Sequence, residues 1–223
     1  MYYNIYIMMK SVFIFILIVS FFNTNLAFAA INTSQTSIPA KQQTITSTQD
    51  TNKLKSQAIL LYSTNDIEKA YRILNQIDEN NKDAEVYLLL ANILQDYGKS
   101  IDSVFLLQKS ILKDPKFYKP YYNLANIYFQ DNKFNLAIKN YKYSLKYNPK
   151  FPYAYYNLAN CYFNLKDYNK AIKYYIKALR ITPEPDFYYN LALSYKNLNN
   201  LKQAEKYLNI YNELLKQKLA PSE

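Results

Sequence analysis

The sequence predicts an all-α protein built from repeated pairs of helices, and three observations lead to this prediction. Short sequence markers recur at a nearly constant interval along most of the chain. Within each repeat, apolar residues follow the i, i+3, i+4, i+7 spacing of amphipathic helices. The 223 residues include one glycine, which disfavours an architecture of tight β-turns because such turns need positive φ angles.

Two kinds of marker set the period. A Leu-Ala pair begins at Leu90, Leu124, Leu158 and Leu191, which gives a period of about 34 residues. Prolines recur independently with the same period, at Pro115, Pro149 and Pro183. A fixed period of this length is the signature of a helical repeat protein.

Each repeat divides into two predicted helices, for example over 121–129 and 134–145, with a short polar stretch between them. The recurring proline ends the second helix, because the residue before a proline is pushed out of the α region. Small residues recur where two helices must approach closely. On the first helices these are Ala91, Ala125, Ala159 and Ala192, and on the second helices Ala70, Ser103, Ala137, Ala171 and Ala204.

These repeats resemble the tetratricopeptide repeat (TPR) family. The segment 152–184 carries the family pattern at Tyr155, Leu158, Ala159, Tyr162, Ala171, Tyr175, Ala178 and Pro183. Segments 84–117 and 118–151 carry the same pattern, with serine at some of the small positions and, in 84–117, leucine at two of the aromatic ones, Leu94 and Leu107. Segments 51–83 and 185–218 lack the final proline and are interpreted as degenerate capping repeats. The resemblance implies a right-handed α-solenoid whose first helices line a concave groove.

The resemblance also implies which side chains line this groove. A peptide-binding set follows by position: Tyr122, Asn126, Phe129, Tyr156, Asn160, Phe163 and Tyr189. Asparagine can donate to and accept from a peptide backbone, and aromatic rings offer rigid contact area. The asparagines can instead serve polar groups of the scaffold itself, and the sequence leaves both roles open. Tyr128, Tyr162, Tyr175 and Cys161 are expected in the core.

The composition excludes most catalytic chemistry. There is no His to act as a general acid or base, and the one Cys cannot form an internal disulfide or a thiolate metal site. One Gly cannot form a phosphate-binding loop. We therefore expect a protein that is not an enzyme and that uses no metal and no other cofactor.

The pattern of residues 1–29 predicts a signal peptide. Lys10 precedes an apolar block at 11–22, and Ala27-Phe28-Ala29 forms a cleavage signal, so the mature chain is expected to start at Ala30 and to lie outside the cytoplasm. The alternative is an uncleaved segment that tethers the repeats to the membrane, still outside the cytoplasm. Segment 30–50 is rich in Ser, Thr and Gln and is expected to be a disordered spacer.

The formal net charge is +10. Many lysines fall on the predicted second helices, where they suit acidic partners, anionic lipids or nucleic acid, or simply face solvent. We favour the solvated face and expect no nucleic-acid partner. The sequence as a whole predicts an exported scaffold that binds a peptide or helix of a partner protein. The alternatives are a membrane-tethered assembly factor and an accessory subunit that presents substrate to an enzyme of the cell envelope.

Overall fold

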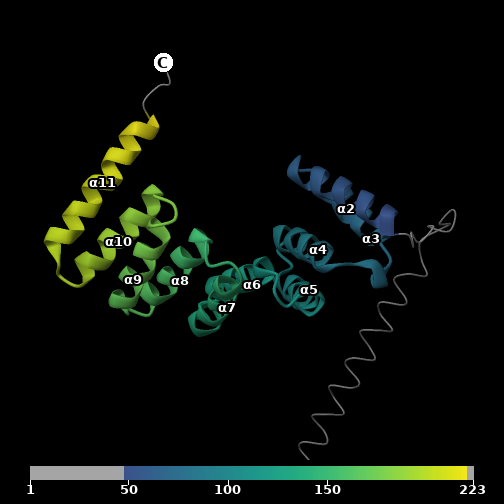
Figure 1. Ribbon diagram of the computed structural model, residues 1–223, viewed down its shortest axis with the longest axis horizontal. Coiled ribbons are helices and arrows are strands. Elements are labelled where there is room, and N and C mark those ends of the chain that lie inside the picture. The colour runs from purple at the N-terminus through teal and green to yellow at the C-terminus, as the bar shows by residue number, and fades with distance from the viewer. Residues whose placement is uncertain (1–47, 220–223) are drawn as a thin grey trace, which may run out of the picture. The chain divides into compact units, whose positions relative to one another are not determined.

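The computed structural model describes residues 48–219, which form ten α-helices, one short 3-10 helix and no β-strand (Figure 1). The helices are α2 (Thr48–Ser63), α3 (Ile67–Gln76), α4 (Ala84–Asp96), α5 (Ser100–Lys113), α6 (Tyr118–Gln130), α7 (Phe134–Tyr147), α8 (Pro152–Asn164), α9 (Tyr168–Leu179), α10 (Pro185–Asn197) and α11 (Leu201–Leu219); the 3-10 helix is η1 (Glu79–Asn81). The all-α prediction is therefore confirmed.

The described helices pack in the order in which they occur. Within each repeat the first helix contacts the second, as in α4 with α5, α6 with α7, and α8 with α9. Each second helix then contacts the first helix of the next repeat, as in α7 with α8 and α9 with α10. This nearest-neighbour packing makes the chain an α-helical solenoid.

Some of the predicted segments fall outside the described residues. The expected signal peptide lies wholly outside them, as does most of the expected spacer at 30–50. Helix α2 begins at Thr48, inside that spacer segment and shortly before the expected start of the first repeat. Among the described residues, no helix combines the length and the apolar character that crossing a membrane would require.

The predicted small residues lie at the helix contacts. Ala125, Ala159, Ala137 and Ala171 have no exposed surface, and the serines at equivalent sites, Ser103, Ser110 and Ser144, are equally buried. Ala204 in the last helix is the exception and is half-buried, because no further repeat covers α11 within the described residues. Large aromatic side chains fill the space beside the small ones, and Tyr141 and Tyr175 are almost completely buried.

The turn between the two helices of each repeat contains one residue with a positive φ angle. These residues are Asn65, Gly98, Asn132, Lys166 and Asn199, with φ between 58° and 72°. They recur with the same period as the Leu-Ala pairs, so they form a further marker of the repeat. Asparagine tolerates this left-handed conformation better than most residues do, which explains how helical hairpins form in a chain with one glycine.

Candidate functional site

The predicted groove residues lie on the first helices α6, α8 and α10. Tyr122 and Tyr156 are half-buried, and Tyr189 is 41% exposed. The Tyr122 ring packs edge-on against Phe151, the residue that directly precedes α8 of the next repeat, with ring centres 4.8 Å apart. The Tyr156 ring stacks on Phe187 across the following junction, at 4.4 Å. Both tyrosines therefore connect neighbouring repeats and keep part of their surface accessible.

Phe129 and Phe163 occupy equivalent places at the end of the first helices, where both are half-buried. Phe129 packs edge-on against Phe134 with ring centres 5.5 Å apart, and Phe163 packs against Tyr168 at 5.4 Å. Each ring thus joins the two helices of its own hairpin near the turn and is not fully covered.

The asparagines of the predicted set belong to a hydrogen-bonded ladder that runs from repeat to repeat. The Tyr141 hydroxyl on α7 donates to Asn126 Oδ1 at 2.6 Å. Asn157 Nδ2, from the next repeat, donates to the same Asn126 oxygen and to the Tyr122 hydroxyl, both at 3.1 Å. One oxygen atom therefore joins the two helices of its own repeat to the first helix of the next.

The same arrangement returns one repeat later. The Tyr175 hydroxyl donates to Asn160 Oδ1 at 2.5 Å, and Asn190 Nδ2 donates to the Tyr156 hydroxyl at 2.6 Å. Asn190 Nδ2 also reaches Asn160 Oδ1, at 3.4 Å. We call these residues the asparagine–tyrosine ladder, which consists of Tyr122, Asn126, Tyr141, Tyr156, Asn157, Asn160, Tyr175 and Asn190.

The ladder is simpler in the repeat formed by α4 and α5. Leu107 occupies the position of Tyr141 and Tyr175, and Leu88 occupies that of Tyr122 and Tyr156. The one remaining ladder bond that we find at this junction is from Asn123 Nδ2 to Asn92 Oδ1, at 2.6 Å. The two leucines have no hydroxyl, so they cannot form the other bonds of the ladder.

Burial affects the acidity of the ladder tyrosines. It raises the pKa of Tyr122 and Tyr156, and hydrogen bonds from the neighbouring asparagine amides oppose this shift. It also raises the pKa of Tyr141 and Tyr175 strongly, because their hydroxyls lie deeper between the helices. All four hydroxyls therefore stay protonated at neutral pH and act as hydrogen-bonding groups of the scaffold.

The sequence left two roles open for the asparagines, and the structure gives Asn126 and Asn160 contacts within the scaffold. Their carbonyl oxygens are occupied by groups of the protein. The spacing of residues within one helix does not predict these hydrogen-bond partners, because they lie on the second helix of the same repeat and on the first helix of the next. A recurring signal was present in the sequence, since asparagines at 123, 157 and 190 accompany those at 92, 126 and 160.

The residues predicted for the core lie there. Tyr162 and Tyr175 are buried, Tyr128 is half-buried against the core, and Cys161 has no exposed surface. Burial raises the pKa of the Cys161 thiol to about 12, so the reactive thiolate is scarce at neutral pH. The cysteine acts as a small apolar core residue.

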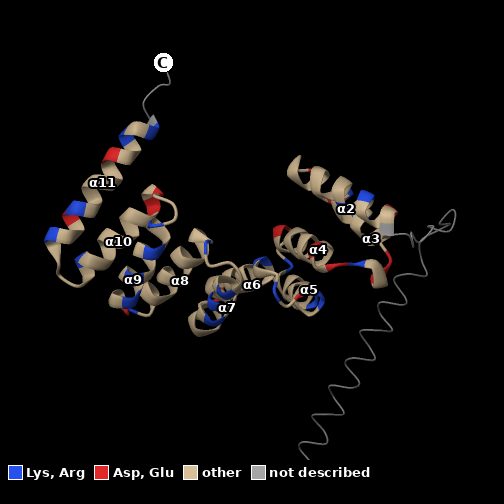
Figure 2. Cartoon of the chain, viewed as in Figure 1, with Lys and Arg blue, Asp and Glu red and all other residues tan. Residues whose placement is uncertain are grey.

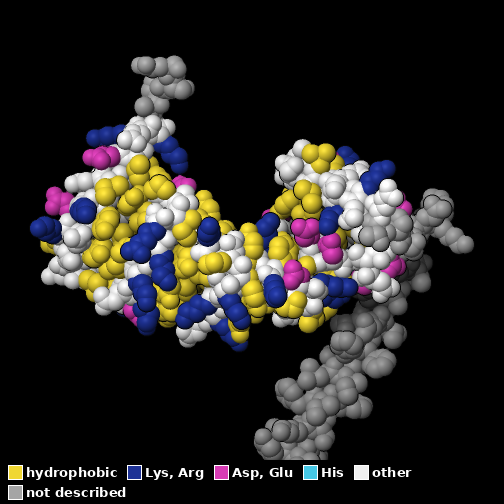
Figure 3. Space-filling model, viewed as in Figure 1, with side chains coloured by type: hydrophobic (Ala, Val, Ile, Leu, Met, Phe, Trp, Pro, Cys, Tyr) yellow, Lys and Arg dark blue, Asp and Glu magenta, His cyan; other side chains and the backbone are white. Residues whose placement is uncertain are grey.

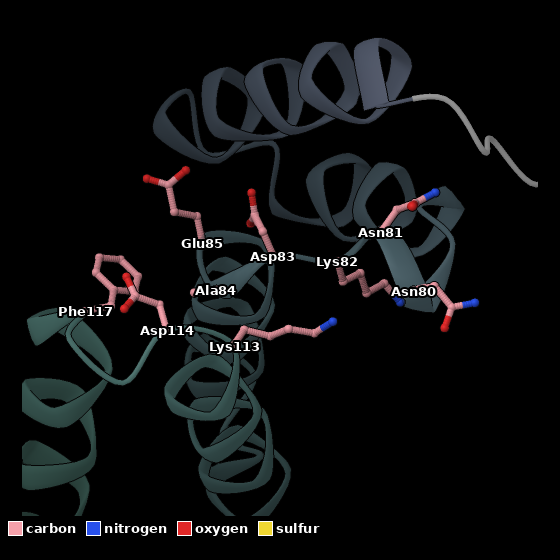
Figure 4. A pocket seen from close by; sticks show the side chains of 9 residues that line it. All are labelled: Asn80, Asn81, Lys82, Asp83, Ala84, Glu85, Lys113, Asp114 and Phe117. Atoms are coloured by element: carbon pink, nitrogen blue, oxygen red, sulfur yellow. The ribbon is translucent and has the colours of Figure 1, made fainter.

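A cavity of about 500 Å³ lies between η1, the start of α4 and the end of α5 (Figure 4). Two of its acids are engaged within the scaffold. Lys55 Nζ on α2 donates to Asp83 at 2.7 Å and to Glu85 at 2.8 Å, and Asp83 also caps α4 by accepting from the Val86 amide. Residues 48–219 hold no cluster of three or more His, Cys, Asp or Glu side chains that could bind a metal ion.

Glu79 of η1 contacts both helices of the second pair, α4 and α5. Its carboxylate accepts from Lys109 at 2.6 Å, from Tyr87 at 2.8 Å and from Lys82 at 3.0 Å. Hydrogen bonds from Lys109, Lys82 and Tyr87 lower the pKa of Glu79 to about 2. This acid holds α4 and α5 against η1 and is occupied by these structural contacts.

Charge is distributed unevenly along the repeats (Figure 2). Residues 51–117 contain nine Lys and Arg and nine Asp and Glu, so they are neutral. Residues 118–218 contain sixteen Lys and Arg against six Asp and Glu, a net charge of +10. On the face seen in Figure 3, basic side chains gather over α7 and α9 among hydrophobic ones.

Comparison with protein families identifies the repeats. Four tetratricopeptide repeat profiles match the chain, at residues 106–139, 125–166, 152–185 and 185–209. A search of curated proteins finds no match. The four matches support a TPR protein and agree with the period found in the sequence.

Comparison with solved structures identifies the same fold. A crystal structure of MamA is 25% identical with a TM-score of 0.65, and the match covers 72% of this chain and 95% of that one. A second MamA crystal structure is 24% identical with a TM-score of 0.65, covering 78% and 97%. MamA from Desulfovibrio magneticus RS-1, residues 41 to the end, is 19% identical with a TM-score of 0.68, covering 76% and 97%. Helical repeats of this kind present extended binding surfaces to other proteins.

Proposed function

Because the chain carries tetratricopeptide repeats, we propose that it is an exported, non-catalytic scaffold that binds an extended peptide or a helix of a partner protein. The observation that carries this proposal is the row of partly exposed aromatic side chains on successive first helices, Tyr122, Tyr156 and Tyr189, with Phe129 and Phe163 beside them. Aromatic rings held by a rigid scaffold are efficient contact residues because they lose little conformational entropy on binding.

The ladder supports this role by fixing the positions of the rings. The hydroxyls of Tyr122 and Tyr156 are held by Asn157 and Asn190, and their rings pack on Phe151 and Phe187. A preorganised surface binds more tightly because it loses less entropy on ordering. The proposed contacts are therefore ring faces and edges, with the asparagines acting as positioning residues.

The non-catalytic part of the proposal rests on chemistry. The chain has no histidine, its cysteine is buried with a raised pKa, and Asp83 in the cavity beside η1 is held by Lys55 and by helix capping. Export rests on the apolar block at 11–22 and the Ala27-Phe28-Ala29 signal. Intact-mass measurement of the protein from its own cells should show the loss of residues 1–29, and recovery of the full-length chain in the cytoplasm would contradict export.

Site-specific photo-crosslinking tests the groove. A benzophenone amino acid replaces Tyr189 or Phe163 on the first helices, or Lys173 on α9 as the matched control on the second-helix layer. Illumination in intact cells should give discrete protein adducts from positions 189 and 163. Adducts that form from position 173 and from neither groove position would refute the groove as the binding surface.

A further inference from the structure

Helix α5, the second helix of its repeat, carries an apolar stripe on its solvent side. On α5, Ile101 is 87% exposed, Leu112 is 80% exposed and Phe105 is 57% exposed. Together with exposed Gln108 these residues are spaced i, i+4, i+7 and i+11, so they lie along one face of the helix. Three large apolar side chains on one open face are uncommon in a soluble surface and mark an interaction site.

The same face is basic in the next repeat. The residues of α7 that correspond to the α5 stripe, one repeat later, are Asn135, Lys139, Lys142 and Lys146, and all four are exposed. A shallow depression of about 290 Å³ lies among Lys139, Lys142, Tyr143 and Lys146. None of these three lysines takes part in the ion pairs found within residues 48–219.

The pattern continues on α9. One repeat further on, the equivalent residues are Asn169, Lys173, Ile176 and Arg180; Ile176 is half-buried and the other three are exposed. Successive second helices thus present an apolar stripe followed by two basic ones, at equivalent positions of the repeat. We call residues 101, 105, 108 and 112 with their equivalents on α7 and α9 the outer stripe.

We propose that the outer stripe docks the protein on the surface of a bilayer that contains anionic lipids. Ile101, Phe105 and Leu112 enter the boundary between head groups and acyl chains, and the lysines of α7 and α9 contact the lipid phosphates. Large apolar side chains beside a polybasic surface are the combination that holds peripheral proteins on such bilayers.

Charge and side-chain type argue against two other occupants. A second copy of this chain, paired by two-fold symmetry so that the whole outer stripe is covered, would place α7 of one copy against α7 of the other. The lysines of the two α7 helices would then repel each other. Single-stranded nucleic acid matches the lysines but binds by stacking on aromatic rings. Phe105 is the one aromatic residue among the three apolar residues of the α5 stripe, and the two more exposed ones, Ile101 and Leu112, have no ring, so the stripe favours a lipid phase.

The chain contains no Trp, which allows a direct test in the full-length protein. A Phe105→Trp variant places a single reporter in the stripe, where Phe105 is 57% exposed, and Tyr189→Trp places one in the predicted groove, where Tyr189 is 41% exposed. Each is titrated with vesicles of phosphatidylcholine and phosphatidylglycerol at seven to three, with and without brominated acyl chains. We expect a blue shift and bromine quenching for Phe105→Trp, and neither for Tyr189→Trp. Because the fluorescence comes from position 105, it reports contact between the stripe and the bilayer and not contact made by residues 1–47.

Two further variants test the two parts of the stripe in the Phe105→Trp background. Lys139→Gln, Lys142→Gln and Lys146→Gln together should weaken vesicle binding at the reporter by roughly 100-fold, since each lysine near an anionic bilayer contributes about five-fold. Ile101→Ser with Leu112→Ser should abolish quenching. The charge-matched control, Lys53→Gln, Lys69→Gln and Lys196→Gln, changes exposed lysines outside the outer stripe and should bind as the parent does.

Several results would overturn the proposal. Equal quenching at positions 105 and 189 would show that the outer stripe is not the part of the protein that contacts the bilayer. Equal binding to vesicles of pure phosphatidylcholine would show that anionic lipid is not required. A blue-shifted Phe105→Trp emission before vesicles are added would show that the stripe is already covered by this chain or a second copy. Binding of a single-stranded oligonucleotide that needs the three lysines but not Ile101 and Leu112, without vesicle quenching, would assign the surface to nucleic acid. Groove crosslinking is independent of each of these outcomes.

Discussion

Replacing Asn160 by alanine should destabilise the protein, although this residue belongs to the predicted groove. The Tyr175 hydroxyl donates to Asn160 Oδ1 at 2.5 Å, and Tyr175 is 1% exposed, so water cannot replace the lost acceptor. A buried donor left without a partner costs about 1–3 kcal/mol. The second bond, from Asn190 at 3.4 Å, is long, and Asn190 keeps its bond to Tyr156, so it adds little. We expect a loss of about 2 kcal/mol in the free energy of unfolding.

The assay is urea denaturation followed by far-ultraviolet circular dichroism, with the slope of the transition compared among variants. Asn169→Ala is the control, because Asn169 is exposed on α9 and its side chain makes no hydrogen bond that we find with the described residues. The double variant Asn160→Ala with Tyr175→Phe removes both partners and should recover about 1 kcal/mol of the loss. An Asn160→Ala variant within about 0.5 kcal/mol of Asn169→Ala would refute the scaffold role of the ladder.

Three other predictions concern stability. The Ser144 hydroxyl is buried without a hydrogen-bond partner among the described residues, so Ser144→Ala should be neutral or stabilising. Ser110→Ala should cost about 1 kcal/mol in the same melts because its hydroxyl donates to a buried carbonyl at 2.6 Å, and the opposite order would contradict the assigned contacts. The pKa of Glu79 is lowered to about 2, so the stability that this carboxylate adds to the folded protein is complete above its ordinary pKa of 4.5 and is lost as the pH falls toward 2. Glu79→Gln should flatten this part of a curve of stability against pH, and an unchanged curve would count against the hydrogen bonds assigned to Glu79. Lys166 has a φ of 60°, so Lys166→Gly should raise stability by about 1 kcal/mol, whereas Gly98→Ala at φ 72° should lower it by a similar amount; melts that show the reverse would contradict the turn geometry.

Local patterns in the sequence were sufficient to predict the fold. Markers such as Leu158-Ala159 and Pro183 depend on packing inside one helical hairpin, and hairpins of one kind stack in one way. The turns were harder to predict, because the count of one glycine suggested that positive φ angles would be rare. Asn65, Asn132 and Asn199 supply them instead, and their regular spacing, two repeats apart, was visible in the sequence.

The candidate site was predicted less completely. The positions of Tyr122, Tyr156 and Tyr189 on first helices follow from the repeat, but the partners of Asn126 and Asn160 come from neighbouring repeats and helices. Hydrogen bonds between repeats depend on how far one repeat is rotated against the next, and residue spacing does not determine this angle. The exposure of Ile101 and Leu112 likewise depends on how the helices stack. The sequence of α5 alone shows which residues share a face of the helix, but not which face the neighbouring helices leave uncovered.

The ladder also determines how many repeats open together. Its bonds join α6 to α8 and α8 to α10 through two contacts each, whereas a single asparagine pair joins α4 to α6. In a solenoid, the coupling between neighbours sets the size of the segment that loses structure at once. Amide hydrogens from α6 to α11 should therefore exchange with solvent as one cooperative block, and those of α2 to α5 should exchange through smaller and more frequent openings.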